Sequence, residues 1–191
     1  MEATKQIKKL ADKLTDQIDR SLSIQRHHAI SKQADSIKID RSVIIAIYLI
    51  ENHFRPFRIR TVEYSMLILA FIANRVVARP IKNYTVGRFQ IGLTSILRHG
   101  GYTGYKVHDR NISKLSLSEL LYILSRCSFH NNLVVCCQIV RGFTDKIELE
   151  WGANQYNTGR IGEKYNGKKN YGFLLLEITK RLKETEGRSS E

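Results

Sequence analysis

Proline, cysteine and tryptophan are all scarce in this chain of 191 residues, which contains two, three and one of them respectively. Because proline interrupts helices and helix-forming residues are plentiful here, this composition predicts a mainly helical protein. The cysteines are Cys127, Cys136 and Cys137. Their odd number, and the position of two of them side by side in an apolar run, predict buried, reduced thiols. No CxxC pair or Cys/His spacing indicates zinc, so we expect neither a metal nor another cofactor.

The sequence also lacks the long apolar segments that membranes and export require. The run Ile44–Ile50 is much shorter than the roughly 20 residues that span a bilayer, so we expect no membrane span. The first residues, Met-Glu-Ala-Thr-Lys-Gln, lack the apolar core of a secretory signal. We therefore expect the protein to stay in the cytoplasm, to leave it by a route that needs no such signal, or to be numbered from a mature or trimmed start.

Acidic residues are few beside the basic ones. The chain has 18 Asp and Glu against 31 Lys and Arg, which gives a formal net charge of +13. Such an excess predicts a polyanionic partner: nucleic acid, an anionic membrane surface or bacterial cell wall. The basic residues are scattered, and no helix-turn-helix, zinc-finger or RNA-recognition pattern is present. Nucleic-acid binding is therefore kept as an alternative function.

The spacing of apolar residues predicts helices along most of the chain. We expect them over residues 4–24, 42–55, 61–79, 93–98, 116–127, 131–143, 144–156 and 170–183. The expected N-caps are Asp40 or Ser42 for the second of these helices, a capping box of Ser116 and Glu119 for the fifth, and Thr144 for the seventh. Residues 25–39 are polar, and the glycine-containing stretch after residue 156 is expected to be a loop. Residues 82–92 are rich in β-branched and aromatic residues and predict a short hairpin with its bend at Gly87.

One carboxylate follows a strongly apolar helix. Glu51 comes directly after the run Ile44–Ile50, near the point where Arg55 and Pro56 are expected to end the helix. Apolar surroundings and the negative end of the helix dipole both raise the pKa of a carboxyl group. A protonated carboxyl near neutral pH is what a general acid needs. The alternative is a solvated Glu51 that pairs with Arg55 four residues later.

Three short motifs follow one another in a recognisable order. Glu51-Asn52 ends the apolar helix, Gly87-Arg-Phe-Gln-Ile91 lies in the hairpin, and Gln155-Tyr-Asn-Thr-Gly159 precedes Tyr171. Over roughly residues 40–180 this order resembles the lytic transglycosylases of the lysozyme superfamily. That family has an E-S pair at the end of a helix, then a G-L-M-Q-I-like stretch, then an A-Y-N-A-G-like stretch and a tyrosine before the last helix.

The resemblance implies a mainly α (α+β) fold: a lysozyme-like catalytic domain at residues 40–183 with a small β-hairpin. A basic helical extension at residues 1–39 would precede it, and a disordered tail at residues 184–191 would follow. The implied partners are peptidoglycan glycan strands and, through the N-terminal helix, a partner protein. The implied place of action is the bacterial cell wall or periplasm.

The resemblance also implies the chemistry, which is cleavage of the MurNAc-GlcNAc β-1,4 bond with Glu51 as acid and then base. Residues 82–92 contain no second carboxylate, which agrees with a single-Glu mechanism that yields a 1,6-anhydromuramyl product. The implied substrate-binding residues are Gln90, Phe89, Tyr156 and Asn157. Gln90 would hydrogen-bond the sugar, and Tyr156 would position the carboxyl group or the N-acetyl group. Phe89 lines a sugar subsite or belongs to the core, and Asn157 ties down a turn. These residues would line a cleft between the Glu51 helix, residues 82–92 and the 155–159 turn.

The sequence departs from the family pattern in three ways. Asn52 replaces the usual serine, and Arg88 and Phe89 replace the usual Leu-Met pair. The stretch between Glu51 and Gln90 is longer than the family's, which makes Glu63 the rival for the catalytic acid. A lysozyme-type muramidase, with its second acid elsewhere, and an inactive lysozyme-like interaction protein remain alternatives.

Overall fold

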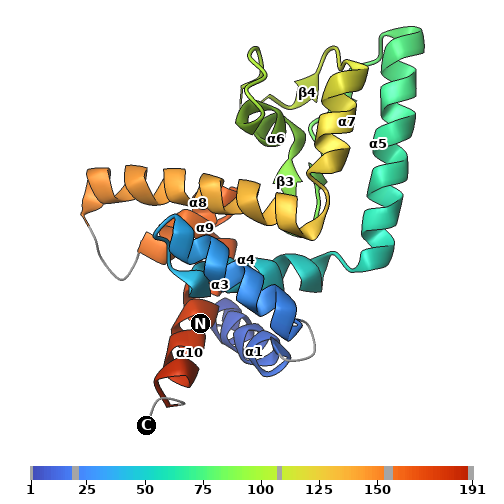
Figure 1. Ribbon diagram of the computed structural model, residues 1–191. Coiled ribbons are helices and arrows are strands. Elements are labelled where there is room, and N and C mark those ends of the chain that lie inside the picture. Colours follow the sequence, from blue (N-terminus) through green and yellow to red (C-terminus); the bar gives the residue numbers. More distant parts are fainter. Residues whose placement is uncertain (1, 19–21, 107–108, 153–156, 189–191) are drawn as a thin grey trace. The chain divides into compact units, whose positions relative to one another are not determined.

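The computed structural model describes residues 2–18, 22–106, 109–152 and 157–188 (Figure 1). Its helices are α1 (Glu2–Asp16), α3 (Ile24–Ser36), α4 (Arg41–Phe54), α5 (Phe57–Val77), α6 (Leu93–His99), α7 (Leu117–Ser125), α8 (Phe129–Trp151), α9 (Asn157–Asn166) and α10 (Lys169–Arg188). Two antiparallel pairs of short strands complete it: β1 (Ile81–Lys82) with β4 (Asn111–Ile112), and β2 (Thr85–Val86) with β3 (Ile91–Gly92). The predicted mainly α class with a small β element is confirmed.

The chain folds into two compact units, each described by itself. The first consists of Met1–His53 and Cys137–Glu191, and the second of Phe54–Cys136. The sequence predicted a division into residues 1–39, 40–183 and 184–191. Those boundaries differ from the boundaries of the two units, and the predicted domains stay a prediction.

Helix α4 lies in the core of the first unit. Every residue from Ser42 to Glu51 is buried. Asp40 caps the helix, because its Oδ1 accepts a hydrogen bond from the backbone N–H of Ser42 at 2.9 Å. The predicted start and end of this helix are confirmed, and an uninterrupted apolar run corresponds to a helix buried on most sides.

One helix was predicted over residues 4–24, but α1 ends at Asp16. A further helix, α3, begins at Ile24 with Ser23 as its N-cap. The sequence did not predict α3, because only Ile30 and Ala34 are buried along it and the helical repeat is correspondingly weak.

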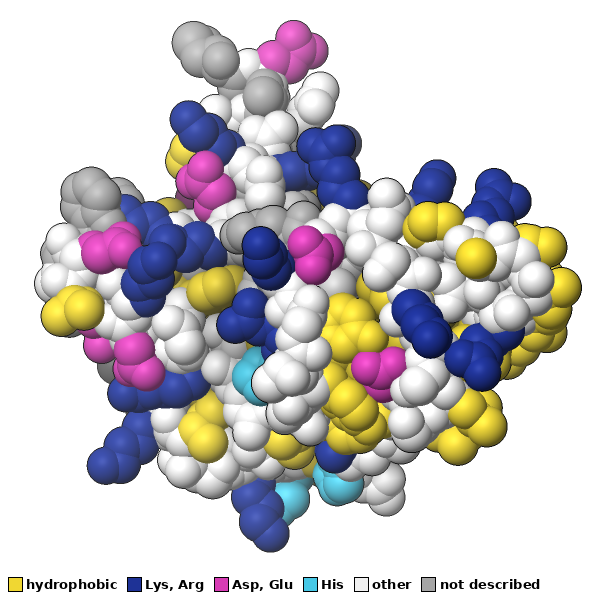
Figure 2. All heavy atoms as spheres, turned by 90° about the horizontal axis from the view of Figure 1, so that it is seen from above, with side chains coloured by type: hydrophobic (Ala, Val, Ile, Leu, Met, Phe, Trp, Pro, Cys, Tyr) yellow, Lys and Arg dark blue, Asp and Glu magenta, His cyan; other side chains and the backbone are white. Residues whose placement is uncertain are grey.

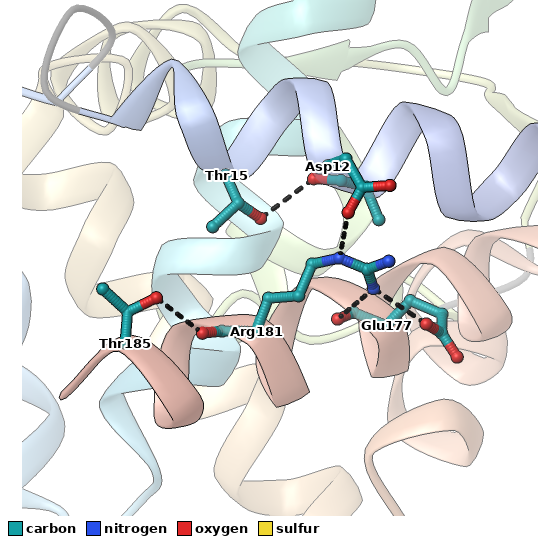
Figure 3. A network of polar contacts seen from close by, with 6 residues as sticks. Asp12, Thr15, Glu177, Arg181 and Thr185 are labelled. Carbon is teal, nitrogen blue, oxygen red and sulfur yellow. Dashed lines mark hydrogen bonds and ion pairs between the residues drawn. The ribbon is translucent and has the colours of Figure 1, made fainter. Parts of the chain in front are cut away.

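Helix α1 packs against α10 (Figure 1). Figure 3 shows how Arg181 of α10 joins the two helices. Its Nε donates to Asp12 of α1 at 2.6 Å, and its Nη1 donates to Glu177 of α10 at 2.8 Å. The N-terminal helix therefore packs within the first unit, and its predicted contact with a partner protein stays a prediction.

Helix α8 is continuous where the sequence predicted two helices. Thr144 was expected to cap the second of them. Instead its Oγ1 donates to the carbonyl oxygen of Val140, one turn earlier, at 2.9 Å. A threonine that bonds back in this way stays inside a helix, so the predicted break was wrong.

Residues after 156 were predicted to form a loop, but they form α9. Its glycines serve helix packing. A Cβ added to Gly172 of α10 would lie 2.3 Å from the carbonyl oxygen of Gly159, and one added to Gly162 would lie 2.9 Å from the Cα of Gly172. Glycine lets two helices approach backbone to backbone. The glycines therefore mark a close crossing of α9 and α10 rather than a turn.

Helix α10 continues to Arg188, past the predicted end at Lys183. The predicted disorder is therefore wrong for residues 184–188, and residues 189–191 lie outside the described part. Two ion pairs connect this end of α10 to the start of α4: Lys183 with Asp40, and Arg41 with Glu186 at 3.0 Å. These two ion pairs hold the last turns of α10 against the start of α4.

In the second unit, α5 packs beside β1 and β2, while α6 packs beside α7 and β3. The predicted hairpin is confirmed as β2 and β3, with Gly87 at a positive φ of 80° between them. The capping box at Ser116 and Glu119 is confirmed at the start of α7. Many apolar side chains of α5 are exposed, and Figure 2 shows hydrophobic side chains along the right-hand edge, where α5 lies.

The predicted reduced thiols are confirmed, because none of the three cysteines forms a disulfide bond. Cys136 and Cys137 are buried as expected, whereas Cys127 is half-buried. Burial raises the pKa of Cys137 to about 12 and that of Cys127 to about 11, so both stay protonated at neutral pH. Within the described ranges, no three His, Cys, Asp or Glu side chains gather in a way that could hold a metal ion. In the same ranges, no helix has the length and apolar content to cross a membrane.

Candidate functional site

Glu51 is a buried acid near the C-terminal end of α4, with only 6% of its surface exposed. The solvated alternative with an Arg55 partner is wrong, because Glu51 is buried and Arg55 forms its ion pair with Glu63. The next residue, Asn52, donates its side-chain N–H to the carbonyl oxygen of Tyr48 at 2.6 Å. This bond directs the Asn52 side chain back along the helix.

His53 follows Glu51 by two residues. Its pKa is lowered, first by burial and second by the positive charge of Lys13 on α1. Near neutral pH the imidazole is therefore uncharged.

Gln90 is held rigidly in the turn between β2 and β3. Its backbone adopts a φ of 49°, in the left-handed region that residues other than glycine seldom occupy. Its Oε1 accepts from the Thr85 hydroxyl at 2.7 Å, and its Nε2 donates to the carbonyl oxygen of Gly87 at 3.0 Å. A third contact, at 3.4 Å, joins Nε2 to Oε2 of Glu63. Residues held in strained backbone regions by several contacts are common at functional sites.

Glu63, the rival acid, belongs to the same cluster. Its Oε1 pairs with Arg55 and its Oε2 accepts from Gln90. Both carboxylate oxygens of Glu63 are therefore held by neighbouring side chains, which suits a positioning role. The structure thus brings Glu63 and Gln90 together within the second unit.

Asn132 of α8 anchors the Gly87–Ile91 turn. Its Oδ1 accepts from the backbone N–H of Phe89 at 2.8 Å, and a Cβ added to Gly87 would lie within 2.4 Å of its side chain. The ring of Phe89 is fully buried, with its centre 6.0 Å from that of Phe129. In this conformation Phe89 offers no surface to a sugar and lies in the core, which was the second possibility for it.

Asn157 lies at the start of α9, where its Nδ2 donates to the carbonyl oxygen of Gly152 at 2.9 Å. This bond joins the start of α9 to Gly152. Asn157 also lines a hollow of about 430 Å³ together with Asp40 and Val43 at the start of α4. Glu51 comes eight residues after Val43, or about 12 Å further along the helix. The first unit therefore places Asn157 towards the opposite end of α4 from Glu51.

The hollow itself has a basic rim. Its charged lining residues are four cations and two acids: Lys38, Arg141, Lys180, Lys183, Asp40 and Glu148. Within the rim, Lys183 pairs with Asp40. Arg141 pairs with Asp145 and also donates to the carbonyl oxygen of Lys38 at 3.0 Å. Two of the four cations, Arg141 and Lys183, therefore already have ion-pair partners.

The remaining predicted site residue, Tyr156, lies outside the described residues. Of the others, Glu51 and Asn157 belong to the first unit, and Phe89 and Gln90 to the second. Their predicted roles stay predictions.

The comparisons give no relative. Protein-family models, curated proteins and solved structures were all searched, and none matches this chain. The resemblance to lytic transglycosylases therefore rests on the motifs alone.

Sequence reasoning missed the part that Asn132 plays and the contact between Glu63 and Gln90. A signal for the first was present, because Asn132 opens the apolar stretch Leu133–Cys137 and a buried amide must find a hydrogen-bond partner. No local signal existed for the second, since 27 residues separate Glu63 from Gln90.

Proposed function

We propose that this chain cleaves the glycan strands of peptidoglycan as a lytic transglycosylase with a lysozyme-like domain. The observation that carries the proposal is the burial of Glu51. Among the described residues, it is the one acidic side chain that is buried. Burial of a carboxyl group favours its protonated form, and a general acid must hold a proton until the bond breaks. The order of the motifs at Glu51, Gly87–Ile91 and Gln155–Gly159 supports the choice of substrate.

In the proposed reaction, Glu51 donates its proton to the oxygen of the β-1,4 bond as that oxygen leaves C1 of MurNAc. The 6-hydroxyl of the same sugar then attacks C1, and the Glu51 carboxylate takes up the hydroxyl proton. The products are a 1,6-anhydromuramyl end and a free GlcNAc hydroxyl, without consumption of water. One carboxylate is enough for this sequence, whereas most glycosidases need two.

Gln90 and Glu63 have separate roles in this proposal. The Gln90 amide contacts the sugar, and Glu63 positions that amide through the 3.4 Å contact between the two side chains. Removal of the Glu63 charge should therefore weaken substrate binding more than it slows the chemical step.

Mass spectrometry of purified peptidoglycan tests the proposal with three proteins: wild type, Glu51→Gln and Glu63→Gln. We expect anhydromuramyl products from wild type. Glu51→Gln should reduce their rate of formation by about 10²–10⁴-fold, which is the usual contribution of a general acid. Glu63→Gln should keep the rate at saturating substrate within about tenfold and raise KM.

Other results would change the assignment. Reducing-end products that disappear in Glu51→Gln would keep this acid but indicate a lysozyme-type muramidase. Equal products from wild type and Glu51→Gln would transfer the catalytic role to Glu63 or to another acid. Products from none of the three proteins would overturn the enzyme proposal.

The net charge of +13 favours nucleic-acid binding as the second candidate. A gel-shift titration with duplex DNA at two salt concentrations tests it. Retention at low salt that is lost at high salt, together with no glycan cleavage, would favour this candidate over the enzyme.

A further inference from the structure

One face of α5 carries exposed apolar side chains from Ile59 to Val76. Six of them, here called the α5 stripe, are between 45% and 76% exposed: Ile59, Val62, Met66, Leu69, Ile72 and Val76. Successive members lie three or four residues apart, so they line one side of the helix. Contiguous exposed apolar surfaces of this kind usually mark a binding surface.

The second unit fixes the rotation of α5 about its axis, so the stripe cannot turn inward. On the opposite face Leu67 is fully buried, and Asn74 connects α5 to the segment before α7. The Asn74 side chain donates to the carbonyl oxygen of Ser113 at 2.8 Å and accepts from the backbone N–H of Leu115 at 3.1 Å. Buried hydrogen bonds of this kind are costly to break.

The charge beside the stripe is positive. Arg58 and Arg75 are exposed near its two ends, and neither forms an ion pair within the described residues. The single acid of α5, Glu63, is held by Arg55 and Gln90. The surface that covers the stripe should therefore be apolar at its centre and anionic at its edges.

We propose that the α5 stripe binds the surface of an anionic lipid bilayer, with α5 lying in the plane of the interface. Apolar side chains enter the boundary between head groups and acyl chains, while long arginine side chains reach the lipid phosphates. A bilayer accepts a convex ridge and needs no matching groove. A second copy of the chain fits less well, because an antiparallel pair of α5 helices would bring Arg58 close to Arg75 of the other copy.

Vesicle sedimentation tests this with the full chain and two vesicle types: phosphatidylcholine alone, and phosphatidylcholine with 30% phosphatidylglycerol. We expect binding to the anionic vesicles that weakens in 0.5 M NaCl. Leu69→Glu should reduce the partition coefficient by about tenfold or more, because one buried leucine is lost and a charge is added. Leu149→Glu is the matched control. It makes the same change in charge at an exposed leucine of α8, outside the stripe, and should alter binding less than twofold.

Two results would overturn the proposal: no binding by the wild type, or equal binding by Leu69→Glu and Leu149→Glu. Far-UV circular dichroism of each variant verifies that it folds, and Leu69→Gln gives a second test without the added charge. Sedimentation velocity distinguishes the rival occupant, since a dimer that Leu69→Glu dissociates would make the stripe a self-association surface. The lipid-binding proposal does not rest on the glycan-cleaving function. Glu51→Gln should therefore bind vesicles as the wild type does.

Discussion

Helices α4 and α5 follow each other in the chain, and both are rich in aliphatic residues, yet their environments are opposite. In α4 every residue from Ser42 to Glu51 is buried. In α5 the six residues of the stripe are exposed, while two polar residues, Arg60 and Asn74, are buried. Apolar content therefore predicts that a helix forms but does not predict which side of it is covered. In α4 the uninterrupted run leaves no polar side to face water, whereas α5 has polar residues on both sides of its stripe.

The two helices should differ most in how much the free energy of unfolding falls when an isoleucine is replaced by alanine. Ile47→Ala in α4 should lower the free energy of unfolding by about 2–5 kcal/mol, because it leaves a cavity in the core. Ile72→Ala in α5 removes the same atoms from a side chain that is half exposed, and should change the free energy of unfolding by less than about 0.5 kcal/mol. Urea unfolding of the two variants measures both values. If Ile72→Ala cost as much as Ile47→Ala, the α5 stripe would be covered and the comparison would fail.

The sequence predicted the elements whose signals are local. The apolar run with its Asp40 cap, the hairpin bend at Gly87 and the capping box at Ser116 each depend on residues close in the chain, and all three were found. The burial of Glu51 was also predictable, since the seven apolar residues before it leave it on a covered helix.

The errors have a common physical cause. A threonine such as Thr144 can begin a helix or lie inside one, and its hydrogen bond to Val140 shows that it lies inside. Glycines can mark a loop or a close helix crossing, and the glycines of α9 lie against the backbone of α10. The candidate site has the same limit. The sequence indicated that a buried Asn132 needs a hydrogen-bond partner, but it could not predict that the partner is Phe89, 43 positions away.

The second prediction extends the comparison to two glycines of a single helix, α10. A Cβ at Gly172 would meet the backbone carbonyl of Gly159 at 2.3 Å, whereas a Cβ at Gly187 would meet nothing within 4 Å. Gly172→Ala should therefore lower the free energy of unfolding by about 1–3 kcal/mol, because α9 and α10 must move apart. Gly187→Ala should raise it by up to about 1 kcal/mol, since alanine favours a helix. Thermal melts of the two variants give the signs, and a harmless Gly172→Ala would argue against the close crossing.

The prediction with the smallest expected effect concerns Glu119. In contrast to the buried Glu51, this acid is stabilised in its charged form by helix capping. Burial by itself would raise the pKa of Glu119. Hydrogen bonds from the backbone N–H of Ser116, from the Tyr105 hydroxyl and from the Ser116 hydroxyl outweigh burial, and the pKa lies below its ordinary value of 4.5. A lowered pKa means that the folded state favours the carboxylate. The stabilisation is therefore complete above pH 4.5 and is lost as the pH falls through the lowered pKa.

Glu119→Gln isolates this charge, because glutamine at the same position still accepts a hydrogen bond from Ser116. The wild type should exceed the variant in free energy of unfolding by about 0.5 kcal/mol at pH 7, a modest value because the side chain is partly solvated. Urea titrations between pH 7 and pH 2.5 should show this difference disappearing below pH 4.5. A difference that stayed constant over the whole range would mean that the amide fits the cap less well than the carboxylate for reasons of shape. Capping at α7 would then depend on geometry alone.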